Sequence, residues 1–132
     1  MRFVDSSFWI ALNFLRDGRH ADARALWEEG QAALLTSGLV LGETWTFLRR
    51  RVGHGHAGGF LDATRMVAGL SVLHVDDGLE DEAWNWLRRH DERPYSFVDA
   101  TSFALMRRRR IREALAFDGD FSAAGFVEVR PR

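Results

Sequence analysis

Short apolar runs alternate with longer helical segments along the chain, and this alternation limits the possible folds more than any other feature. The apolar runs have the composition of buried strands and lie at residues 3–4, 33–36, 71–75, 114–117 and 126–129. Helical patterns occupy residues 7–15, 20–29, 39–52, 57–68, 79–90 and 97–109, with a short turn or helix at 120–124. Such alternation favours an α/β fold, with a central, mostly parallel sheet and helices on both faces. Because no linker interrupts the pattern, we expect a single domain over residues 1–132.

The residue types that are missing exclude several mechanisms. The chain has no cysteine, and all 18 of its basic residues are arginine. Disulfides, thiolate metal sites and a cysteine nucleophile are therefore excluded, as is any chemistry that needs a lysine. The net charge of −1 does not indicate a strongly basic nucleic-acid binder. We find neither a signal peptide nor an apolar stretch of transmembrane length, so we expect a cytoplasmic protein without a membrane partner.

Two acidic residues follow predicted strands directly. Asp5 comes after the run Phe3-Val4, and Asp118 comes after the run that ends at Phe117. In an open parallel sheet, ligands bind outside the carboxyl ends of the strands. Both carboxylates are therefore expected at the edge of the sheet where an active site would form.

Two further acidic residues interrupt helical stripes that are otherwise apolar. Glu43 lies four residues from both Leu39 and Phe47, and Asp99 shares a helix face with Phe103 and Met106. A carboxylate on a buried stripe is costly unless it is paired or binds a cation. We therefore expect Glu43 and Asp99 to be buried functional groups.

These four carboxylates are candidates for one metal site. Two like charges about 4 Å apart repel by roughly 4 kcal/mol at an intermediate dielectric, so four together require a cation or shifted protonation. An oxygen-only ligand set suits a hard divalent ion such as Mg²⁺ or Mn²⁺. Such ions activate water and stabilise charge in phosphoryl transfer.

Four segments carry a resemblance to a known family. In chain order they are FVDSS at 3–7, LGET at 41–44, YSFVDATSF at 95–103, and AFDGDF at 116–121 with AGF at 124–126. Together they resemble the signature of a PIN domain and, more narrowly, the VapC toxins of bacterial toxin–antitoxin pairs. The resemblance covers essentially the whole chain.

The resemblance implies a fold, an activity and partners. The implied fold is a three-layer α/β sandwich, and the implied activity is that of a metal-dependent endoribonuclease that acts as a toxin on an RNA substrate. Asp5, Glu43, Asp99 and Asp118 would surround Mg²⁺ or Mn²⁺. Homodimerisation and inhibition by a small VapB-like antitoxin encoded alongside are implied as well.

Two residues beside these acids leave alternatives open. Asp120 occupies a position that is often basic or histidine in close relatives, so it is either an additional metal ligand or a cap for the turn that follows, and we favour the cap. Ser6 adjoins Asp5 and is either a helix cap or a residue that supports the metal ligands from behind.

Arginine clusters end two of the predicted helices. Arg49 and Arg50 belong to one cluster, and Arg107 and Arg108 to the other. They either complement the helix dipole in solvent or contact RNA phosphates beside the acidic pocket. The glycine-rich segment 53–56 predicts a flexible loop, whose two histidines do not form a metal site.

Other functions compete with a toxin nuclease. One alternative is an RNA-processing nuclease of the same fold without a toxin role. Another is a non-catalytic binding domain of that fold. A phosphorylation-switched receiver domain also clusters acids at strand ends, but that family and the haloacid-dehalogenase-like phosphatases rely on a lysine that this chain lacks.

Overall fold

The computed structural model describes residues 1–30 and 33–132, which form a parallel sheet enclosed by helices. The strands are β1 (Arg2–Val4), β2 (Leu34–Ser37), β3 (Leu70–Leu73), β4 (Glu113–Leu115) and β5 (Val127–Glu128). The helices are α1 (Ser6–Asn13), α2 (His20–Glu28), α3 (Gly38–Arg51), α4 (His54–Thr64), α5 (Asp77–Arg89), α6 (Phe97–Arg109) and α7 (Asp120–Ala123). No helix within these described residues is long and apolar enough to cross a membrane.

The sheet has the order β3-β2-β1-β4-β5, and each neighbouring pair is parallel. Phe3 of β1 aligns with Leu35 of β2 and Ala114 of β4, and all three are fully buried. Continuous burial along a strand is typical of a parallel sheet that is covered on both faces. The predicted fold class is therefore confirmed.

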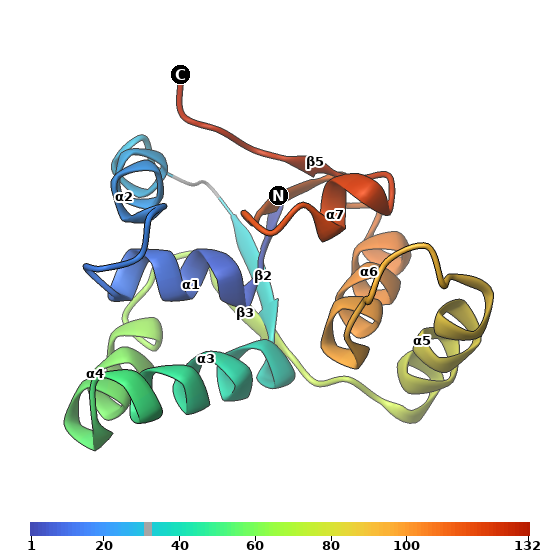
Figure 1. Ribbon diagram of the computed structural model, residues 1–132, viewed down its shortest axis with the longest axis horizontal. Helices are drawn as coiled ribbons and strands as arrows, with labels where there is room; N and C mark the ends of the chain where they lie inside the picture. The colour runs from blue at the N-terminus through green and yellow to red at the C-terminus, as the bar shows by residue number, and fades with distance from the viewer. Residues whose placement is uncertain (31–32) are drawn as a thin grey trace.

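Helices cover the two faces of the sheet in two groups (Figure 1). α1 to α4 lie on one side, where α1 packs against α2 and α3, and α3 packs against α4. α5, α6 and α7 lie on the other side, where α6 packs against both of the others. The carboxyl end of β1 and the starts of α1, α3 and α6 therefore face the region between the two groups.

An aromatic cluster fills the core on the α6 side. The ring of Phe103 lies 4.9 Å from that of Phe121 and 5.1 Å from that of Trp86, measured between centroids, in edge-on contacts. Phe103 is fully buried. This packing holds α6, and with it Asp99, against the sheet.

The structure corrects the prediction of a loop at residues 53–56. α4 begins at His54, because Ala57 and Phe60 of the same segment are buried in the core. The ring Nε2 of His56 donates a hydrogen bond of 2.8 Å to the carbonyl oxygen of Asn13, which ties α4 to the end of α1. Burial of two side chains thus outweighs the low helix propensity of the glycines.

Candidate active site

Asp5 connects the end of β1 to the start of α1. Its backbone N–H donates to the carbonyl oxygen of Leu115 at 3.0 Å, which brings the ends of β1 and β4 together. Its Oδ2 caps α1 by accepting from the backbone N–H of Ser7 at 3.1 Å and from the Ser7 hydroxyl at 2.7 Å. The second oxygen, Oδ1, is buried and has no hydrogen-bond partner among the described residues.

Burial, with a smaller effect of the nearby carboxylates of Asp118 and Asp99, raises the pKa of Asp5 to about 8, against the lowering effect of Ser7. A buried oxygen without a hydrogen-bond partner destabilises the folded state unless a donor or a cation binds to it. Asp5 therefore has a buried oxygen that a ligand could satisfy, close enough to Asp118 and Asp99 to feel their charges.

Asp99 occupies the third position of α6 and forms a capping box with Ser96. The Ser96 hydroxyl accepts from the Asp99 backbone N–H at 2.9 Å, and Asp99 Oδ2 accepts from the Ser96 N–H at 3.1 Å. Asp99 is buried, as its place on an apolar stripe predicts. Burial raises the pKa of this carboxyl to about 7, and the charges of Asp118 and Asp120 act in the same direction.

Asp118 and Asp120 lie beyond the end of β4 and complete a cluster with Asp99. One carboxylate oxygen of each of these three residues lies within 4.8 Å of the other two. Asp118 Oδ1 accepts from the backbone N–H of Asp120 at 3.1 Å. Partial removal from water raises the pKa of Asp118, with the charges of Asp120 and Glu128 adding to the effect.

Asp120 does not cap the turn that follows it, so the role as a cap that we favoured from the sequence is wrong. It is the first residue of α7, whose N-cap is Gly119 without a side-chain cap bond. Its Oδ1 instead pairs with the guanidinium of Arg93, whose Nη2 lies 2.9 Å away. Gly119 has a φ of 84°, which favours glycine, and a Cβ there would meet Arg93 Nη2 at 3.4 Å. The tight turn thus sets two acids side by side.

Glu43 does not lie on the buried face of α3, and this prediction is also wrong. Glu43 is exposed, and Leu39 beside it is 36% exposed. The stripe that faces the core is shifted by one residue. It consists of Val40, Thr44 and Leu48.

Ser6 links Glu43 to the rest of the cluster. The Ser6 hydroxyl donates to Glu43 Oε1, and Ser6 follows Asp5 directly in the chain. Ser6 is the first residue of α1 rather than its cap, because Asp5 has that role. The structure therefore brings Glu43 to the rim of the site, outside the group formed by Asp99, Asp118 and Asp120.

Two residues of the site were not singled out from the sequence. Ser7 donates to Asp5 and accepts from the backbone N–H of Phe117 at 3.0 Å, so it fastens α1 to the end of β4. Arg93 has a partly exposed side chain. Among the described residues, it is the only cation that pairs with an acid of the cluster formed by Asp99, Asp118 and Asp120. The sequence could have indicated Ser7, because it follows Asp5 and Ser6 directly. No neighbouring residue in the sequence indicates a role for Arg93.

The predicted arginine clusters occupy different surroundings. Arg49 and Arg50 are exposed at the end of α3. Arg107 and Arg108 lie two turns beyond Asp99 on α6, about 12 Å along the helix axis at 1.5 Å per residue. Arg108 already pairs with Glu82 of α5 and with Asp76, which caps that helix.

The acids present fit a divalent cation. Their donor set consists of carboxylate oxygens, which Mg²⁺ and Mn²⁺ prefer, and Asp5 Oδ1 lacks any other partner among the described residues. Burial, and to a smaller extent the charges of neighbouring acids, raise the pKa values of Asp5, Asp99 and Asp118, so their charged forms are costly in the folded chain without a cation. Binding of a cation would remove that cost.

Comparisons with known proteins show the family to which the chain belongs. The PIN domain family matches residues 2–127. The chain is 58% identical over 131 residues to the 23S rRNA-specific endonuclease VapC20 of Mycobacterium tuberculosis, in strain CDC 1551 / Oshkosh and in strain ATCC 25618 / H37Rv, with 99% of each chain covered.

A solved structure gives the same result. The crystal structure of Mycobacterium tuberculosis VapC20, described as a sarcin–ricin loop cleaving toxin, has a TM-score of 0.94 and 56% sequence identity, and the match covers 99% of this chain and 100% of that one. The resemblance to PIN domains and to VapC toxins is thereby confirmed. The chain belongs to the PIN-domain family.

Proposed function

We propose that this chain is a metal-dependent endoribonuclease that acts as the toxin of a toxin–antitoxin pair and cuts ribosomal RNA. The observation that carries the proposal is its 58% identity, over essentially its full length, to a 23S rRNA-specific endonuclease. The cluster of acids with raised pKa values at the end of β1 and β4 supports a hydrolytic site.

Asp5, Asp99 and Asp118 are the residues that we propose hold Mg²⁺ or Mn²⁺, and Asp120 joins them if it releases Arg93. When bound, the ion supplies an activated water and compensates the charge that develops on a phosphodiester. Asp5 Oδ1 would gain the partner that it lacks in the protein alone.

Glu43 has a separate role in this proposal. Ser6 holds its Oε1, and its exposed position leaves Oε2 open to the substrate. Glu43 would orient the attacking water and accept its proton. Hydrolysis then joins the water oxygen to phosphorus and breaks one P–O bond, and the leaving oxygen takes up a proton.

The proposal extends to partners and location. VapC-type toxins imply a VapB-like antitoxin and a homodimer, and we propose both for this chain, together with a place in the cytoplasm. Size-exclusion chromatography with light scattering of the purified chain, alone and with the product of a neighbouring small open reading frame, tests the two assemblies.

A cleavage assay tests the activity. The substrates are the 23S rRNA sarcin–ricin stem-loop and a shuffled stem-loop of equal length, each with Mg²⁺, with Mn²⁺ or with EDTA. We expect a cut in the first substrate that needs metal and disappears in Asp99→Asn. Asp62→Asn is the matched control, because Asp62 is an exposed acid on α4 with no part in the cluster. Cleavage by Asp99→Asn at the wild-type rate would contradict the proposed site.

A further inference from the structure

An open groove runs along α3 away from the candidate active site. It has a volume of about 580 Å³ and is lined mainly by the exposed side of α3. One end lies at Glu43 and at Val98, the residue directly before Asp99, and the other end lies at Arg50 and Arg51. The groove therefore leads from Glu43, at the rim of the candidate site, to a basic end of the same helix.

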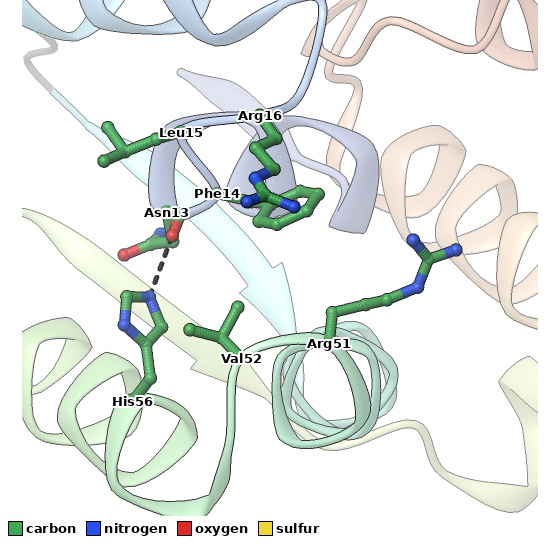
Figure 2. Close-up of a pocket in the computed structure, with 7 residues that line it drawn as sticks. All are labelled: Asn13, Phe14, Leu15, Arg16, Arg51, Val52 and His56. Atoms are coloured by element: carbon green, nitrogen blue, oxygen red, sulfur yellow. Dashed lines mark hydrogen bonds between the residues drawn. The ribbon is translucent and has the colours of Figure 1, made fainter.

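A second cleft continues the groove toward the end of α1. It has a volume of about 460 Å³, shares Arg51 with the groove, and adds Arg16 and His56. Figure 2 shows Arg16 and Phe14 on the segment that follows α1, with Arg51 on the facing end of α3. The rings of Phe14 and Phe47, one from each cleft, meet edge-on at 5.7 Å. We call the two clefts together the α3 groove.

The α3 groove is basic along most of its length. Arg16, Arg50 and Arg51 pair with no acid among the described residues, and Glu43 is the one acid among the described lining residues. The Arg51 guanidinium lies over the Phe47 ring, 5.3 Å from its centroid. These arginines are available to an anionic ligand, whereas Arg108 already pairs with acids of its own chain.

The dimensions of the α3 groove suit a nucleic-acid strand. Glu43 and Arg51 are eight residues apart on α3, which is about 12 Å at 1.5 Å per residue. Phosphates in a stacked strand follow one another at about 3.4 Å along the axis. Roughly three nucleotide steps therefore separate Glu43 from the basic end.

We propose that the α3 groove binds the RNA strand that flanks the scissile phosphate, with Arg50 and Arg51 contacting phosphates about three nucleotides from the cut. This inference rests on the proposed nuclease function. A phosphodiester strand is the ligand that explains both ends of the groove, since its reacting phosphate needs the acids and its next phosphates need cations. Phosphate contacts position a strand without reading its sequence, so the groove would hold any flanking sequence equally.

The salt dependence of RNA binding tests the proposal. Fluorescence anisotropy in EDTA, where metal-dependent cleavage is off, would be measured over a range of salt concentrations. The Arg50→Gln/Arg51→Gln double variant is compared with Arg49→Gln, which removes the same charge type from the same last turn of α3 but lies outside the groove lining. Thermal unfolding of each variant verifies its fold.

Two results are expected. The slope of log affinity against log salt becomes shallower by about 1.4 in the double variant, from about 0.7 for each lost phosphate contact on a single strand, and it is unchanged in Arg49→Gln. With an oligonucleotide trimmed to one nucleotide on either side of the cut, the double variant and the parent bind equally.

Other results would overturn the proposal. An unchanged slope, or an equal loss in Arg49→Gln, would show that the α3 groove holds no phosphates. Loss of antitoxin binding or of dimers in the double variant, with RNA binding intact, would assign the groove to a protein partner. If cleavage persists while the slope is unchanged, the groove inference alone fails. If no metal-dependent cleavage is found at all, the proposed function fails.

Discussion

Replacing Asp5 by asparagine should stabilise the metal-free protein while it removes the activity. Asn is as good an N-cap as Asp, so the side-chain oxygen at position 5 can still accept the hydrogen bond from the Ser7 N–H at the start of α1. What is lost is a buried negative charge close to Asp99 and Asp118, and the pKa of Asp5 is about 8 in the folded protein against 3.8 for the free group.

The sign and the magnitude follow from linkage. Because the folded state holds the proton of Asp5 more tightly than the unfolded state does, the penalty is absent below pH 3.8, grows as pH rises, and is complete above pH 8. A difference of about four pKa units at 1.36 kcal/mol each gives an upper bound of about 6 kcal/mol. We expect Asp5→Asn to exceed the wild type by at least about 1 kcal/mol at pH 8.

Urea unfolding in EDTA at pH 5, 7 and 8 measures this difference, and added Mg²⁺ or Mn²⁺ should narrow it by stabilising the wild type alone. A cation at 100 times its Kd stabilises the protein that binds it by about 2.7 kcal/mol. Asp76→Asn is the control, because Asp76 caps α5 but is exposed, and the Leu79 N–H and Arg108 lower the pKa of Asp76. This variant should lose stability at pH 8. An Asp5→Asn protein that is less stable than the wild type at pH 8 in EDTA would refute the reasoning.

Three further substitutions separate the roles of the surrounding residues. Ser6→Ala removes the hydroxyl that holds Glu43, and we expect kcat to fall about tenfold at unchanged stability, because a general base that is no longer held in position accepts the proton less efficiently; steady-state kinetics and thermal unfolding together test this. Arg93→Gln frees Asp120, so isothermal titration should show tighter Mn²⁺ binding, and weaker binding would contradict the present assignment. Phe103→Ala opens the aromatic core and should cost about 3–5 kcal/mol of unfolding free energy, measured in urea.

The sequence predicts the sheet well because its signals are local. Phe3 and Val4 form a buried run that an acid ends at once, and the structure places them in the central strand. Asp5 and Asp118 meet because parallel strands end at the same edge of a sheet. Asp99 is buried as its helical stripe predicts.

The errors arise where contacts from distant segments decide. On α3, two stripes shifted by one residue are both apolar enough to face the core, and packing against α1 and α4 selects Val40 over Leu39. Asp120 is drawn from its own turn by Arg93, which lies 27 residues away in the chain. Local propensity carries no information about such a partner.

The fold explains why these acids gather at one place. Asp5 caps α1 and Asp99 belongs to the capping box of α6, so each has one oxygen bonded to a helix N-terminus. The positive ends of two helix dipoles therefore point into the cluster and offset part of its repulsion. Both bonds use Oδ2, and in Asp5 the other oxygen is buried without a hydrogen-bond partner among the described residues. The same bonds that begin the helices thus orient the ligand atoms, which is why replacing a cap by asparagine can preserve the fold while it removes the site.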